Sequence, residues 1–314
     1  MSFPVVFHPD YVIRLPEGHR FPADKFGRYA RTLVADGLAL GNAWVEPEEA
    51  PEAWLTLAHD PAYVAAVENG ALTADIVRRI GFPNTPPVAR RARLAVGGTV
   101  LASRLAAAHG LAFNAAGGSH HARRAHGAGF CVFNDVAVAA LLARAEGRAR
   151  RVLIIDLDVH QGDGTAQILA AEPEIFTFSL HCADNYPLHK ERSDLDIELA
   201  RDTGDDEYLT VLAAALPRLF AQARPDLVFY LAGVDVHADD PLGKLTLTDA
   251  GLMARETLVF ETLKREGVPA AVVMAGGYDP DGGRLAARHA LAARAARSLF
   301  SGHSHRMAER AAGI

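Results

Sequence analysis

The chain has 314 residues, half of them hydrophobic, and a formal net charge of −6. This length accommodates one large α/β domain or two smaller ones, and the acidic balance gives no reason to expect direct binding of nucleic acid. Two cysteines, Cys131 and Cys182, are too few for a disulfide framework or a cysteine-rich zinc site. The sequence lacks a secretory signal pattern and an apolar run long enough to span a bilayer, so we expect a soluble, cytoplasmic protein.

Short apolar runs alternate with helical patterns along most of the chain. In chain order, the runs predict strands over 5–8, 111–115, 152–155, 176–180, 226–231 and 270–275. The helical patterns cover 26–38, 93–108, 135–146, 165–171, 206–223, 248–266 and 284–299. This alternation predicts an α/β fold, with a parallel β-sheet and helices on both faces. No composition break, linker or repeat of fixed period divides the chain, so we expect a single domain over residues 1–314.

Three features of the first third of the chain are local. His19 and Arg20 precede the first helix, and the residues alone leave open whether they have a role or only decorate a loop. Asp60 and Pro61 are expected as the N-cap and the first residue of a further helix. The proline-rich segment 81–91 predicts a loop.

The segment around which the rest of the chain is organised is 151–164, RVLIIDLDVHQGDG. Its buried strand ends in Asp156, Asp158 and His160 at alternate positions, so Asp158 and His160 can converge on one point. Ligands of open α/β sheets bind at the carboxyl ends of strands, and these side chains are typical ligands of a catalytic divalent metal. The alternative is that the acids cap the next helix and His160 packs in a loop.

Other strands also end in polar residues. His120 and His121 follow the strand at 111–115, Asp235 follows the strand at 226–231, and Tyr278 follows the strand at 270–275. A parallel sheet gathers such strand ends into one crevice. Two aspartates and one histidine would leave zinc an open coordination position for water and substrate.

The same crevice holds candidates for proton transfer. His120 and His121 are acid/base candidates, and Asp156 and Asp163 can orient them through their ring nitrogens. Tyr278 is a candidate hydroxyl donor to a developing oxyanion. Together these residues describe metal-assisted hydrolysis of an amide.

Five motifs together carry a specific resemblance. They are His120-His121-Ala122, Gly129-Phe130-Cys131, the run from Asp156 to Gly164, Asp235, and Gly276-Gly277-Tyr278. The chain resembles the zinc-dependent histone deacetylase family from about residue 8 to about residue 300, which implies the arginase/deacetylase fold and one zinc ion. The implied site residues are Asp158, His160 and Asp235 on zinc; His120 and His121 beside the attacking water; Asp156 behind His120 and Asp163 behind His121; His121 as general base and acid; and Tyr278 as oxyanion donor.

The resemblance also implies a substrate tunnel and a second ion. Gly129 and Phe130 would line the acyl-lysine tunnel, and Tyr186 would cover the apolar stem of the lysine. A structural potassium ion would be held by Asp156, Asp158, His160, Ser179 and Leu180. His126, His181 and Cys131 lie in the same region, and we interpret them as structural.

The implied activity is removal of an acyl group from an amine such as an acyl-lysine side chain. Tyr186-Pro187, the segments 193–196 and 204–208, and Asp240 to Gly243 are similar to class IV histone deacetylases and their bacterial relatives, some of which remove long acyl chains. The run from Asp235 to Leu242 also resembles bacterial acetylpolyamine and acetoin-utilisation deacetylases. The acyl chain and the amine therefore stay open, as does the oligomeric state.

Two rival functions use the same fold. A binuclear manganese ureohydrolase needs further carboxylates, but Gly162 and His237 stand where these would be expected. A non-catalytic acyl-lysine binding protein would be indicated by loss of Tyr278 or of a metal ligand, and none is lost. Both observations favour a mononuclear hydrolase.

Overall fold

A computed structural model describes residues 3–38 and 44–300. Within these residues one seven-stranded sheet has the order β1-β2-β7-β6-β3-β4-β5, and every pairing in it is parallel. The strands are β1 (Val5–Val6), β2 (Leu111–Asn114), β3 (Val152–Asp156), β4 (Ile175–Cys182), β5 (Leu195–Leu199), β6 (Leu227–Leu231) and β7 (Ala270–Val273). The predicted α/β class with a parallel sheet is therefore confirmed.

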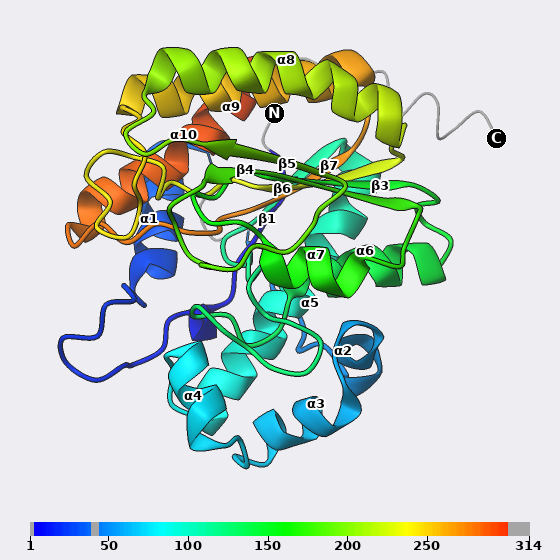
Figure 1. Ribbon diagram of the computed structural model, residues 1–314, viewed down its shortest axis with the longest axis vertical. Coiled ribbons are helices and arrows are strands. Elements are labelled where there is room, and N and C mark those ends of the chain that lie inside the picture. The colour runs from blue at the N-terminus through cyan, green and yellow to red at the C-terminus, as the bar shows by residue number, and fades with distance from the viewer. Residues whose placement is uncertain (1–2, 39–43, 301–314) are drawn as a thin grey trace.

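Helices cover both faces of this sheet. They are η1 (Pro9–Tyr11), α1 (Lys25–Ala35), α2 (Glu52–Ala58), α3 (Pro61–Glu68), α4 (Ala74–Ile80), α5 (Pro86–His109), α6 (Asp135–Ala145), α7 (Asp163–Leu169), α8 (Asp205–Ala223), α9 (Asp249–Glu266) and α10 (Gly282–Phe300). Figure 1 shows α8 and α9 over one face, α5, α6 and α7 on the other, and α2, α3 and α4 farther from the sheet. All residues of the inner strand β3 are buried, as expected for a parallel strand covered on both sides.

The structure corrects several predicted elements. The segment 81–91 is not a loop throughout, because α5 begins at Pro86 with two prolines in its first turn, where no backbone N–H is needed. Strand β5 was not predicted, since it is a half-exposed edge strand with two acids among its five residues. Helices α2 and α4 were also missed because each has only seven residues. Helix α7 begins at Asp163 and not at Thr165.

The predicted start of α3 is confirmed. Asp60 is the N-cap and Pro61 is the first helical residue, although the side chain of Asp60 makes no capping hydrogen bond. Among the described residues, none of the helices combines the length and the apolar character that crossing a bilayer requires.

Candidate active site

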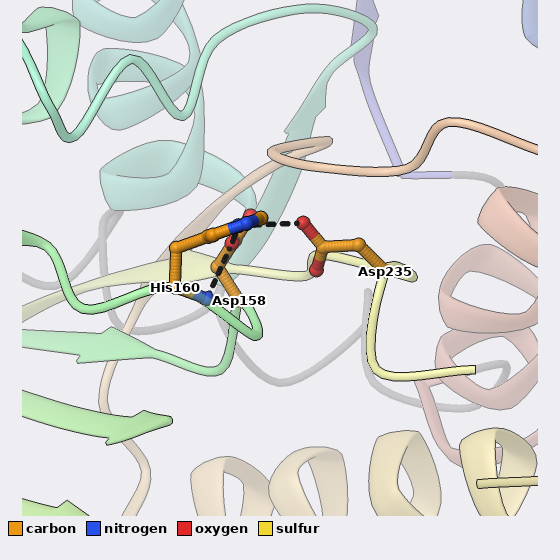
Figure 2. Close-up of side chains that lie close together, drawn as sticks. All are labelled: Asp158, His160 and Asp235. Atoms are coloured by element: carbon orange, nitrogen blue, oxygen red, sulfur yellow. Dashed lines mark hydrogen bonds and ion pairs between the residues drawn. The ribbon is translucent and has the colours of Figure 1, made fainter. Parts of the chain in front are cut away.

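Asp158, His160 and Asp235 meet at the carboxyl ends of β3 and β6. Their candidate ligand atoms all lie within 4.8 Å of one another, and the three side chains are buried. His160 Nδ1 lies 2.9 Å from Asp158 Oδ1 and 3.2 Å from Asp235 Oδ2 (Figure 2). Asp235 Oδ2 is buried and, apart from this ion-pair contact with His160, has no hydrogen-bond partner among the described residues. Two carboxylates and an imidazole around an unsatisfied buried oxygen fit a divalent transition metal such as zinc.

The backbone of neighbouring strands holds the two carboxylates in place. Asp158 Oδ2 accepts a 2.7 Å hydrogen bond from the N–H of Gly276, and Asp235 Oδ1 accepts a 2.9 Å bond from the N–H of Val159. A Cβ at Gly276 would overlap both carboxylates, so the turn after β7 can pass this close only with glycine. One oxygen of each carboxylate is thereby occupied by the protein.

A buried arginine from α9 supports the same strand ends. Arg255 Nη1 donates to the carbonyl of Gly233 at 2.7 Å and to that of Leu157 at 3.2 Å, and the side chain is fully buried against Glu256. These two carbonyls belong to the segments that lead into Asp158 and Asp235. The sequence carried no signal for this role, because an arginine in a helical pattern usually faces solvent.

His120 and His121 lie side by side beneath the surface, each with its own aspartate. His120 Nδ1 lies 2.7 Å from Asp156 Oδ2, and His121 Nδ1 lies 2.6 Å from Asp163 Oδ1. The ring centroids of the two histidines are 4.1 Å apart. Each Nδ1 therefore faces its own carboxylate, and each Nε2 points away from it, that of His120 lying 3.8 Å from Asp158 Oδ1.

The two histidines differ in charge preference. Burial lowers the pKa of His121 to about 4, and the nearby charge of His120 adds to that effect. Burial also disfavours the charged form of His120, but Asp156 and Asp158 outweigh it and raise the pKa of His120 to about 9. A neutral His121 can accept a proton at Nε2, which is the property that a general base needs.

Tyr278 follows β7 and faces the same cavity. Its backbone N–H donates to Asp240 Oδ2 at 2.7 Å, and its ring centroid lies 5.9 Å from that of Phe130 and 6.5 Å from that of His160. Burial, followed by the charges of Asp158 and Asp235, raises the pKa of Tyr278 well above its usual value. The hydroxyl therefore stays protonated and can donate a hydrogen bond. Asp240 was noted in the sequence only as part of a subgroup motif.

Gly129, Phe130 and Tyr186 surround His121 on its outer side. The ring of Tyr186 meets that of His121 edge-on, with centroids 4.8 Å apart. A Cβ at Gly129 would lie 2.5 Å from His121 Cδ2, so this position requires glycine. The backbone of Phe130 (φ 65°) is held by a 2.7 Å hydrogen bond from its N–H to the carbonyl of Ile80. Gly129 and Phe130 line the cavity that contains His121, and Tyr186 contacts the His121 ring.

The inner end of the cavity contains two buried cations that sequence reasoning missed. Lys25 Nζ donates to the carbonyls of Ala275 at 3.0 Å and Gly277 at 3.2 Å. The Arg91 guanidinium lies over the ring of Phe26, 4.6 Å from its centroid. Both residues line the cavity that also contains His120, His121, Asp158 and Tyr278. The sequence placed Lys25 just before the helical pattern 26–38 and Arg91 at the end of the predicted loop 81–91, where cations are ordinarily solvated, so only long-range packing reveals them.

The remaining predicted residues fall into three groups. Asp156 pairs with Ser179 across β3 and β4, next to Leu180, so the proposed potassium ligands lie on adjacent segments. Cys131 is buried with a free thiol, and His126 and His181 make only local contacts. His19 is half-buried, with Nε2 2.8 Å from the carbonyl of Gly81 and its ring stacked on Phe82, whereas Arg20 is exposed.

Across residues 3–38 and 44–300, Asp158, His160 and Asp235 are the one group of three or more His, Cys, Asp or Glu residues close enough to share a metal. His237 lies elsewhere, with Nε2 3.3 Å from Asp249 Oδ1. The described residues therefore offer one metal position and no second carboxylate cluster beside it.

Comparison with known proteins agrees with this geometry. Residues 19–294 match the family described as histone deacetylase domain. An uncharacterized protein of Picosynechococcus sp. is 50% identical over 300 residues, covering 96% of this chain and 100% of its own. Histone deacetylase 2 of Arabidopsis thaliana is 34% identical over 278 residues, covering 86% of this chain and 72% of its own. The crystal structure of an acetylpolyamine aminohydrolase from Burkholderia pseudomallei shares the fold, with a TM-score of 0.77, 23% identity, and coverage of 95% of this chain and 99% of that chain.

Proposed function

The chain belongs to the histone deacetylase family, and we propose that it is a zinc-dependent hydrolase acting on an acylated amine such as an acyl-lysine side chain. The observation that carries this proposal is the buried cluster of Asp158, His160 and Asp235 beside two His–Asp pairs. We further propose that residues 1–314 form one catalytic domain with one zinc, and that potassium has a structural role at the segments of Asp156 and Ser179.

The proposed division of labour follows from the atoms that each side chain presents. Asp158, His160 and Asp235 would hold zinc, which when bound supplies a Lewis acid that polarises an amide carbonyl and lowers the pKa of water. His121 takes the proton from the attacking water at Nε2 and returns it to the leaving amine. His120, paired with Asp156, adds positive charge beside the reacting centre. The neutral hydroxyl of Tyr278 donates to the carbonyl oxygen as negative charge develops there.

The walls of the cavity favour a substrate with a thin apolar stem. Phe130 lines the cavity, Tyr186 sets its ring against that of His121, and Gly118 and Gly129 line the cavity with backbone alone. A lysine side chain has such a stem, so we propose acyl-lysine as the substrate. From the class IV resemblance of the sequence motifs, we also propose that longer acyl chains are preferred, with each buried methylene adding about 0.8 kcal/mol.

The second candidate function is deacetylation of a small amine. The observation that favours it is the shared fold with an acetylpolyamine aminohydrolase over nearly the whole chain. This candidate uses the same zinc ligands and the same histidines. The two candidates differ only in the amine that carries the acyl group, which is a lysine side chain in one and a small molecule in the other.

One experiment separates these candidates. Acetyl-, octanoyl- and myristoyl-lysine peptides and acetylated polyamines are assayed with enzyme of defined zinc content. We expect kcat/KM to rise from acetyl to medium or long chains on lysine peptides. Higher rates on acetylated polyamines, with rates on lysine falling steadily beyond acetyl, would favour the small-amine candidate. No hydrolysis of any of these substrates by the zinc-loaded protein would refute the proposed function.

A further inference from the structure

The carboxylate of Asp163 is shared between a histidine and an arginine. Its Oδ1 lies 2.6 Å from His121 Nδ1, while its Oδ2 accepts hydrogen bonds from Arg123 Nη2 at 2.8 Å and Nε at 3.1 Å. The Asp163 side chain is only 1% exposed, so it depends on these partners for compensation of its charge. Two donors on Oδ2 leave Oδ1 facing His121 and fix the plane of the carboxylate.

The same guanidinium also contacts Glu191, which lies in the segment that carries Tyr186. Arg123 Nη1 donates to Glu191 Oε1 at 2.6 Å. The side-chain amide of Gln161 makes two hydrogen bonds to the backbone of Glu191. It accepts one from the N–H at 2.8 Å and donates one to the carbonyl at 2.7 Å. Both the backbone and the side chain of Glu191 are therefore held by hydrogen bonds.

Glu191 ends the segment that carries Tyr186, which we call the rim segment (residues 183–191). Inside it, Lys190 Nζ donates to the carbonyls of Ala183, Asn185 and Pro187 at 3.0, 2.7 and 2.6 Å. One ammonium group thus ties the rim segment into a compact loop. The loop presents Tyr186 against His121 and leaves Leu188 88% exposed at its tip.

We propose that Arg123 is a positioning residue that orients Asp163 under His121 and joins this pair to the rim segment. Through it, one side chain connects the rim segment that carries Tyr186 to the orientation of the proton-transferring histidine. The proposal rests on the proposed function, because it assigns His121 to proton transfer. Although burial raises it, contacts with His121 and Arg123 bring the pKa of Asp163 below its usual value, which agrees with a permanently charged carboxylate.

Kinetics of four variants test the two ends of this chain of contacts. Arg123→Gln removes the positive charge that faces the carboxylates of Asp163 and Glu191. We expect kcat to fall roughly 10- to 100-fold with little change in KM, the range for residues that orient a site through another side chain. Arg123→Lys keeps the charge but not the planar fork, so its kcat should lie between those of wild type and Arg123→Gln. Glu191→Gln should mainly raise KM. Arg124→Gln removes a charge from the exposed neighbour and is the matched control.

A second measurement does not depend on turnover. In the zinc-loaded enzyme without substrate, the Nδ1 proton of His121 should give a downfield NMR signal, assigned by its absence in His121→Ala. We expect this signal to shift in Arg123→Gln and Arg123→Lys and to stay in place in Arg124→Gln. If Arg123→Gln does not fold, the position of the signal in Arg123→Lys relative to the wild type tests the proposal.

The outcomes separate this proposal from the proposed function. If no acylated amine is hydrolysed but the signal shifts as expected, the function is wrong and the positioning by Arg123 stands. An unchanged signal in the Arg123 variants, or an Arg123→Gln enzyme with the kcat of wild type, overturns the positioning role.

Discussion

The backbone N–H of Gly276 donates to Asp158 Oδ2 across 2.7 Å, so the turn that carries Tyr278 also holds a carboxylate of the candidate metal site. A Cβ at position 276 would overlap the carboxylates of both Asp158 and Asp235. We expect Gly276→Ala to displace these carboxylates and to lower the zinc content of the purified protein. Gly204→Ala is the control, because its Cβ would meet only an ordinary contact with Thr246. Full zinc content in Gly276→Ala would show that the turn can move away.

Zinc binding should depend on the carboxylates of Asp158 and Asp235. Elemental analysis is expected to find one zinc per chain in the wild type and none in Asp158→Ala or Asp235→Ala, and both variants should be inactive. The exposed acid Asp206 provides the control, since Asp206→Ala removes a carboxylate far from the cluster. Two tightly bound metals per chain would contradict the mononuclear assignment.

Removal of His121 should separate proton transfer from metal binding. We expect His121→Ala to lower kcat by about 10²–10⁴-fold, the range for loss of a general acid/base, while zinc stays bound. His126→Ala is the control, because His126 makes only a local contact with Gly127. If His120→Ala abolishes activity and His121→Ala is mild, the two histidines have the opposite roles.

The Tyr278 hydroxyl should act mainly in the transition state. Tyr278→Phe keeps the ring that packs on Phe130 but removes the donor, so kcat is expected to fall about 10²–10³-fold with little change in KM. The thermal unfolding midpoint should stay close to that of the wild type, which separates lost chemistry from lost packing. A rise in KM with unchanged kcat would instead assign Tyr278 to substrate binding.

His59 should make the fold sensitive to acid. It is fully buried, its Nδ1 lies 2.9 Å from the carbonyl of Arg123, and its Nε2 accepts from the N–H of Asn134 at 2.9 Å. A protonated ring could not accept that bond. Burial lowers the pKa of His59 from 6.5 to about 4. The unfolded chain therefore binds the proton more tightly, and this contribution to stability is lost as the pH falls from about 6.5 toward about 4.

Chemical denaturation at a series of pH values checks this expectation. The full effect is about 3 kcal/mol, from 1.36 kcal/mol per pKa unit. His59→Gln cannot titrate, so its free energy of unfolding should fall less steeply over this pH range than that of the wild type. Equal slopes for the two proteins would show that other histidines account for the acid sensitivity.

The fold class and the convergence of Asp158, His160 and Asp235 were predictable from local pattern. A buried strand shows as a continuous apolar run, and carboxyl ends of parallel strands necessarily meet at one edge of the sheet. Polar residues placed directly after such runs therefore gather at that edge, and Asp158 and Asp235 meet because β3 and β6 are neighbouring strands. The edge strand β5 lacks such a run, because one of its sides faces solvent, and it was missed for that reason.

The environment of the charged residues around this cluster could not be predicted, because it arises from contacts between distant segments. Arg255 reaches the carbonyl of Leu157, 98 residues away, and Lys25 reaches that of Ala275, 250 residues away. Arg123 joins Asp163 to Glu191 in the same manner. Whether a charge is buried and what compensates it depends on groups that arrive from distant segments, whereas hydrophobic periodicity is a property of neighbouring residues. Local pattern therefore predicts where the polar groups gather, whereas long-range packing selects the charged side chains that hold them in place.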